Sequence, residues 1–191
     1  MNLQKIGVKF FLGSGTEIPL SSFIPVFHHW IQDDLLEGLL VDVAEYTHVH
    51  QGPGVLVVAH EANYSLDEEL GKRGFLYTQK RPPEKSSQEH LATAFRRVLK
   101  GCQLLEKDTA VGGVKFDTTR FQVFVNDRAE APFNSESLGA LESELNPFLS
   151  SLLAGEKFQL IPEKDPQRRV GFEVKVPKPE SLETLAGRLP A

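Results

Sequence analysis

The chain has 191 residues, of which 40% are hydrophobic and 25% are charged, and its formal net charge at pH 7 is −5. This balance excludes a disordered or low-complexity chain, and the absence of a long basic run argues against binding to the phosphate backbone of nucleic acids. No apolar run approaches the roughly 20 residues of a membrane span and residues 1–10 lack a signal peptide, so we expect a cytoplasmic protein that does not bind membranes.

Residues 1–80 predict a first β-α-β-β half. Its elements are a strand, a helix, two longer strands and a shorter strand, at residues 6–12, 22–34, 39–46, 55–61 and 74–78. The segment Gln51-Gly52-Pro53-Gly54, between the two longer strands, is typical of a turn. Consecutive positions of both longer strands are apolar, so we expect both faces of each strand to be covered.

Residues 81–110 predict a linker and a connecting helix. Ser86 and Glu89 have the spacing of a capping box, and the helix behind them is expected to run to about Glu106. Its apolar stripe includes Cys102, which we interpret as a small core residue and not as a catalytic thiol. Because Cys102 is the single cysteine of the chain, an intramolecular disulfide is excluded.

Residues 111–191 predict a second half with the same order of elements. These are a strand, a helix, two strands and a short amphipathic C-terminal segment, at residues 121–125, 135–152, 157–161, 170–176 and 180–189. Asn134 or Ser135 is expected to begin the helix. Pro147 should kink or restart it, because proline lacks the N–H group of an interior helix residue.

Two stretches of the chain, residues 8–19 and residues 121–132, align without a gap, which indicates an internal repeat. The alignment superposes Phe11 on Phe124. One β-α-β-β unit alone would leave a sheet edge exposed, and either a second unit in the chain or a homodimer could cover it. We therefore predict an α+β fold in which two related β-α-β-β halves form one compact unit, with a mixed or antiparallel sheet and helices packed on it.

The placement of the histidines is the chemical feature that points to a site. Residues 111–191 contain no histidine. Five of the six histidines lie in residues 1–80: His28, His29, His48, His50 and His60. If the halves are related, the scaffold itself does not require these side chains. A function is therefore to be sought in the first half.

Two chemical interpretations of this region remain open. The first is an acid–base site with Asp42, Tyr46 and His60 as candidate catalytic residues, because a hairpin allows Asp42 to lie opposite His60. The second is a metal site with His48, His50 and His60 as candidate ligands, because imidazoles with a carboxylate suit zinc or iron. No cofactor is otherwise predicted.

A third set of residues consists of candidates for binding a ligand: His28, Glu61 and Tyr64. Against all three sets stands a structural interpretation, in which these polar side chains are hydrogen-bonded inside the sheet or at its rim. The basic residues around the strand at 74–78 are also simplest to interpret as solvated surface, although they could receive an anionic ligand or partner: Lys72, Arg73, Lys80 and Arg81. The glycine-rich segment 13–16 is interpreted as a strand-to-helix turn, because no P-loop lysine follows it.

Four segments resemble a family of uncharacterised bacterial conserved proteins with no known activity: residues 23–32, 52–55, 59–67 and 124–128. The resemblance implies a bacterial source and an intact single unit, and it transfers no catalytic residue. Together these observations favour a binding or accessory protein without catalytic activity. The alternative is a histidine- and aspartate-dependent enzyme, or a metal-binding protein, with its site in the first half.

Overall fold

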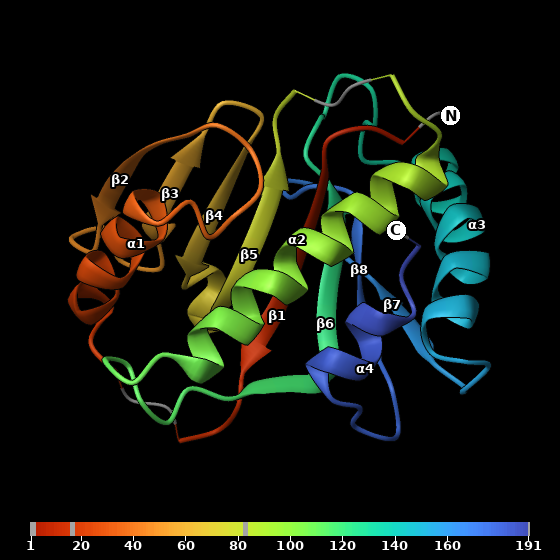
Figure 1. Cartoon of the computed structure of the whole chain (residues 1–191). Coiled ribbons are helices and arrows are strands. Elements are labelled where there is room, and N and C mark those ends of the chain that lie inside the picture. Colours follow the sequence, from red (N-terminus) through yellow and green to blue (C-terminus); the bar gives the residue numbers. More distant parts are fainter. Residues whose placement is uncertain (1–2, 16–17, 82–83, 191) are drawn as a thin grey trace.

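Within residues 3–15, 18–81 and 84–190, which are those that this computed structural model describes, the chain forms one eight-stranded antiparallel sheet and four α-helices (Figure 1). The strands are β1 (Ile6–Leu12), β2 (Leu40–Tyr46), β3 (Gly54–Ala59), β4 (Ala62–Asp67), β5 (Gly74–Gln79), β6 (Phe116–Val125), β7 (Gln159–Pro162) and β8 (Gly171–Lys175). The helices are α1 (Phe23–Gln32), α2 (Ser87–Lys107), α3 (Ser135–Leu152) and α4 (Leu182–Gly187), with 3₁₀ turns η1 (Leu20–Ser22) and η2 (Glu69–Gly71). The predicted α+β fold is confirmed.

The strand order is β2-β3-β4-β5-β1-β6-β8-β7, so the predicted halves meet where β1 pairs with β6. Lys9 lies opposite Gln122 in this pairing, and the sequence alignment superposes the same two residues. If a two-fold axis related the halves and passed between β1 and β6, the residues paired at the axis would also be equivalent in the two halves, as Lys9 and Gln122 are. The internal repeat itself stays a prediction.

The first half contains more strands than the sequence analysis predicted. Strand β4 was not anticipated, and β4 and β5 form the hairpin beside β1, as β7 and β8 do beside β6. Asn63, Ser65 and Asp67 have low strand propensity, which hid β4 in the sequence. Pairing with β3 and β5 on its two sides, together with burial of Tyr64 and Leu66, outweighs that propensity.

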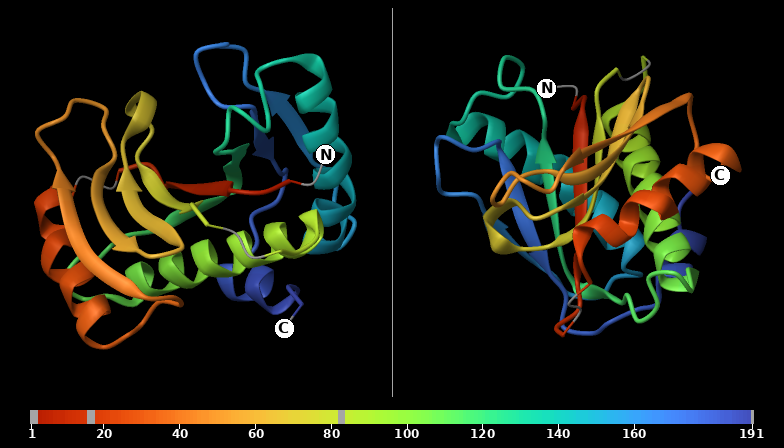
Figure 2. Two further views of the ribbon diagram at one scale, coloured as in Figure 1. Left: turned by 90° about the horizontal axis from the view of Figure 1, so that it is seen from above. Right: turned by 90° about the vertical axis from the view of Figure 1, so that its left-hand side faces the viewer.

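The helices cover one face of the sheet. Side chains alternate along β1, so Phe10 points into the core, where its ring lies 5.0 Å from that of Phe121 and 6.3 Å from that of Phe95 on α2. Cys102 lies fully buried in the same core, and burial raises the pKa of its thiol, which confirms the interpretation as a core residue. Figure 2 shows that the sheet curves, with α2 on its convex side and its concave face turned away from the helices.

The N-terminal ends of α2 and α3 lie at the capping residues predicted from the sequence, whereas the interior of α3 differs from its prediction. Ser86 and Glu89 form the capping box of α2, and the side chain of Asn134 caps α3. The restart expected at Pro147 is wrong, because α3 continues through it from Ser135 to Leu152. Pro147 removes one backbone hydrogen bond, and burial of the neighbouring Leu145, Phe148 and Leu149 keeps the helix in place. Within the described residues, no helix combines the length and the hydropathy needed to cross a bilayer.

The expectation that both faces of β2 are covered is wrong. Among the described residues, β2 forms one edge of the sheet and pairs with β3 alone. Leu39, just before it, is 69% exposed and Val41 within it is 61% exposed. Here, apolar side chains on consecutive positions belong to an exposed edge strand. The sequence pattern alone does not reveal whether a neighbouring element covers a strand.

His90, in the first turn of α2, is fully buried, and neither of its ring nitrogens has a hydrogen-bond partner among the described residues. Burial, reinforced by the charge of Lys85, lowers the pKa of His90. The unfolded chain therefore binds a proton at this position more readily than the folded chain once the pH falls below about 6.5. The stability contributed by neutral His90 is present above that pH and is lost below it.

We expect the free energy of unfolding to fall between pH 7 and pH 5, with a contribution from His90 of at most about 1.4 kcal/mol per pH unit. Urea denaturation at several pH values should show a shallower pH dependence in His90→Leu. His50→Gln, at an exposed position, is the control and should keep the wild-type slope. A wild-type slope in His90→Leu would contradict the prediction.

Candidate functional site

The concave face of the sheet carries a groove above β1. It consists of two adjoining hollows of ≈ 330 Å³ and ≈ 400 Å³, which share Phe11 and Lys72 in their lining. We call the two together the Phe11 groove. The loop that contains η2 borders both hollows, and the β7–β8 loop, residues 163–170, forms the far wall of the first.

The alternation of β1 explains how Lys9 and Phe11 come to face this groove while Phe10 faces the helices. The pairing of β1 with β6 is irregular after Phe10. Phe10 lies opposite Phe121, but the next residue, Phe11, lies opposite Asp117. The three residues between, 118–120, bulge out of the ladder with β1, while Arg120 still pairs with Lys175 of β8. A bulge redirects side chains locally, and here Arg120 lies over the ring of Phe11, 5.6 Å from its centroid.

Beneath the groove, Lys9 forms a buried ion pair with Asp67 of β4. The two side chains are only 3% and 5% exposed. Burial lowers the pKa of Lys9 and raises that of Asp67, and in each case the opposite charge of the partner works against the shift. The Asp67 carboxylate also accepts a hydrogen bond from the backbone N–H of Glu69, which anchors the η2 loop.

At the mouth of the groove, two cations share one carboxylate. Arg120 donates two hydrogen bonds to Glu173 of β8, at 2.7 and 3.0 Å, and the ammonium of Lys72 lies 3.0 Å from the same carboxylate. Burial acts to raise the pKa of Glu173, but the hydrogen bonds from Arg120 and Lys72 outweigh it and the pKa is lowered. Lys72 also lies 5.7 Å from the Phe11 ring.

The positive charge extends into the second hollow. Of the described residues that line it, Lys72, Arg73 and Arg120 are cationic and Asp117 is anionic, and Arg73 is paired with Glu68. The Gly13–Gly15 segment borders the same hollow, but the N–H of Gly13 donates to the carbonyl of Lys115. This backbone group is therefore already used, and the side chains supply the positive charge.

Arg169 links η2 to the β7–β8 loop, the two segments that border the first hollow. Its guanidinium lies 4.1 Å from the centroid of the Phe124 ring and donates to Glu69 at 2.8 Å and to Asn126 at 3.0 Å. Glu69 belongs to η2 and Arg169 to the β7–β8 loop. The contact ties residues 100 positions apart across the concave face.

The structure does not place Asp42 opposite His60. Asp42 pairs with Val58, and its carboxylate accepts a hydrogen bond from the N–H of Val43. His60 follows β3, where its backbone N–H donates to the carbonyl of Leu39, and its ring lies 3.1 Å from the guanidinium of Arg81. The strand register therefore corrects the expected Asp42–His60 arrangement.

The other candidates in the hairpin and on α1 are exposed. Tyr46 and His48 stack on each other with ring centroids 6.3 Å apart, while His50 lies in the β2–β3 turn and His28 on the surface of α1. The described residues contain no group of three or more histidine, cysteine, aspartate or glutamate side chains arranged to hold a metal ion. The structure thus does not bring His48, His50 and His60 together.

Glu61 and Tyr64 are brought close to a common neighbour, Arg97 of α2. The Arg97 guanidinium lies 3.6 Å from Glu61 and 3.3 Å from Glu37, and it donates to the hydroxyl of Tyr77 at 3.1 Å. The Tyr77 ring packs 5.2 Å from that of Tyr64, whose hydroxyl donates to the backbone carbonyl of Glu37. Burial raises the pKa of Tyr64. We interpret this network as a structural link between α2 and the sheet.

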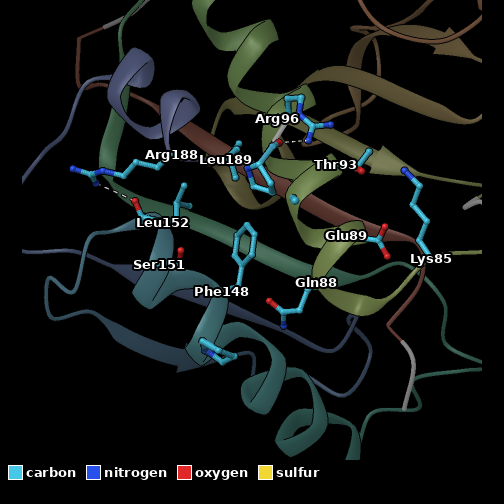
Figure 3. A pocket seen from close by; sticks show the side chains of 13 residues that line it. Lys85, Gln88, Glu89, Thr93, Arg96, Phe148, Ser151, Leu152, Arg188 and Leu189 are labelled. Atoms are coloured by element: carbon cyan, nitrogen blue, oxygen red, sulfur yellow. Dashed lines mark hydrogen bonds between the residues drawn. The ribbon is translucent and has the colours of Figure 1, made fainter.

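A further cavity, of ≈ 480 Å³, lies between α2, α3 and the C-terminal segment (Figure 3). Phe148, Leu152 and Leu189 contribute its apolar lining. Its two arginines are bound to backbone carbonyls, Arg96 to that of Pro190 and Arg188 to that of Leu152. Both guanidiniums thus have backbone partners, whereas in the Phe11 groove two cations share a single carboxylate.

No protein-family model and no curated protein sequence matches this chain. The inference of function therefore rests on the geometry of the site. The residues that line the Phe11 groove were missed in the sequence, apart from Lys72, Arg73 and the Gly13–Gly15 segment. One signal was available, because Lys9 interrupts an apolar strand at a position that its neighbours predict to be buried.

Proposed function

We propose that this protein is a binding protein without catalytic activity, and that its Phe11 groove binds a small anionic ligand that carries a carboxylate or a phosphate. The observation that carries the proposal is the sharing of Glu173 by Lys72 and Arg120. Among the described residues, Glu173 is the carboxylate that both cations contact, and Asp117 acts on Arg120 through its charge alone. An anion at the mouth of the groove would give the two cations a second acceptor.

The geometry of the cations suits such a ligand. Arg120 already holds a carboxylate through two parallel hydrogen bonds, and its side chain is 40% exposed. Lys72 is 44% exposed and borders both hollows. Contacts of both cations with the Phe11 ring hold them at the mouth of the groove, which reduces the entropy that a ligand would lose in ordering them.

The ion pair beneath the groove supports binding in preference to catalysis. Lys9 and Asp67 are the groups here whose pKa values burial shifts against ionisation, as is common for catalytic residues. They are bonded to each other and almost fully covered. This arrangement favours support of the groove floor over proton exchange with a ligand.

The proposal predicts that wild-type protein binds inorganic phosphate or citrate in isothermal titration calorimetry at low ionic strength. Arg120→Ala and Lys72→Ala should each weaken binding by about tenfold or more, because each removes a charge-assisted hydrogen bond to the anion. Glu173→Gln should strengthen binding, since it removes the competing carboxylate. Added salt should weaken it.

Lys100→Ala is the matched control, because Lys100 is exposed on α2, on the opposite side of the sheet. Its affinity should equal that of the wild type. Failure of the wild type to bind either anion would refute the proposal. So would affinities that Arg120→Ala and Lys72→Ala leave unchanged.

A further inference from the structure

The two edges of the sheet differ in how well they are protected against pairing with another chain. β7, at one edge, has four residues and ends at Pro162, and both features block the addition of a strand. β2, at the other edge, has seven residues and contains no proline. A register irregularity lies between Leu40 and Asp42, and pairing with β3 is regular from Asp42 to Tyr46. The β2 edge therefore has a regular stretch that could accept a ninth strand.

The backbone of this edge also has a group that a partner could use. The N–H of Val43 is bonded to the side chain of its own neighbour, Asp42, at 2.8 Å. An exposed side-chain contact of this kind is readily exchanged for a backbone carbonyl of an added strand.

Apolar surface is concentrated at the same edge. The large hydrophobic side chains that are exposed in the described part of the chain all lie between residues 39 and 49: Leu39, Val41, Tyr46 and Val49. A cluster of this kind at a sheet edge is typical of an interaction site.

The negative charge of this part of the chain favours a basic partner. Residues 10–71 contain ten aspartate and glutamate residues and no lysine or arginine. Asp42 and Glu45 lie exposed on β2 itself. A second copy of this edge would bring carboxylates toward carboxylates, which is unfavourable, whereas a basic chain would be attracted.

We propose that the β2 edge binds an extended segment of another protein that carries both apolar and basic side chains, added to the sheet as a further strand. The backbone supplies the hydrogen bonds, and the apolar side chains of the segment cover Val41 and Tyr46. Asp42 and Glu45 lie on opposite faces of β2, because they are three positions apart in its regular stretch, so lysine or arginine side chains on either face of the segment can pair with one of them. This site is separate from the Phe11 groove and independent of the proposed anionic ligand.

The test uses two capped peptides, one in which lysine and valine alternate and one in which glutamate and valine alternate. In ¹H–¹⁵N NMR titrations, the basic peptide should shift the amide signals of β2 and bind at least about tenfold more tightly than the acidic one. A double variant, Asp42→Lys with Glu45→Lys, should reverse this preference. The control, Glu136→Lys with Glu142→Lys on exposed positions of α3, should leave it unchanged.

Equal binding of the two peptides, or shifts confined to other elements, would overturn the proposal. Sedimentation of the wild type provides a second measurement. A concentration-dependent dimer that Val41→Asp abolishes would also overturn it, because the edge would then be occupied by a second copy. A monomer at all concentrations is expected.

Discussion

Replacement of Lys9 by methionine is expected to lower the free energy of unfolding by roughly 3–5 kcal/mol, because it leaves the Asp67 carboxylate buried without its partner. Asp67 would retain only the hydrogen bond from the N–H of Glu69 among its polar contacts in the described structure. Urea denaturation followed by fluorescence measures the effect directly, since Trp30 is the single tryptophan and is buried in the core.

The double variant Lys9→Met with Asp67→Leu separates loss of the ion pair from loss of packing. Replacing both members of a buried pair by apolar side chains of similar volume is often neutral or stabilising. We therefore expect the double variant to recover most of the stability. If it is as unstable as Lys9→Met, the buried charge is not the cause. If the ion pair supports the groove floor, the double variant should also bind anions more weakly than the wild type, even though most of its stability is recovered.

Replacement of Gly101 by alanine is expected to lower the free energy of unfolding by roughly 1–3 kcal/mol, although alanine is the better helix former by about 1 kcal/mol. Gly101 lies in α2 directly over the ring of Phe75, and a Cβ atom at this position would overlap that ring. The ring cannot move aside, because it is fully buried among the rings of Phe27, Trp30 and Tyr64.

Gly139 on α3 provides the matched control. It also lies within a helix, but a Cβ atom there would meet no atom within 4 Å. Gly139→Ala should therefore raise the free energy of unfolding by about 0.5–1 kcal/mol, as expected from helix propensity alone. Stabilisation by Gly101→Ala in the same denaturation experiment would show that α2 does not pack on the sheet as closely as described.

Local signals predicted much of the secondary structure. The strand at residues 6–12, the capping box of Ser86 and Glu89, and the apolar stripe around Cys102 were each predicted from residues close together in the chain. Strand β4 was missed because its polar residues are tolerated only through pairing on both sides. The restart expected at Pro147 was wrong, because packing of α3 outweighs the loss of one hydrogen bond, whereas the kink stays a prediction.

The candidate site was harder to predict for the same physical reason. The histidines stood out by composition, yet the register of β2 and β3 separates Asp42 from His60 and leaves the hairpin histidines at the surface. The residues of the Phe11 groove were inconspicuous. Lys9 and Asp67 are 58 positions apart, and Arg120 and Glu173 are 53 positions apart, so no local pattern links them.

By itself, the amino-acid sequence determined the α+β class, the N-terminal ends of α2 and α3, the core role of Cys102 and the acidic character of residues 10–71, since these depend on composition and short-range spacing. Only the tertiary structure decided which polar side chains meet and which strand forms an edge. Both outcomes depend on strand order and register, which arise from long-range pairing. That pairing places Lys9 under the groove, gathers the cations around Phe11, and leaves β2 open to a partner.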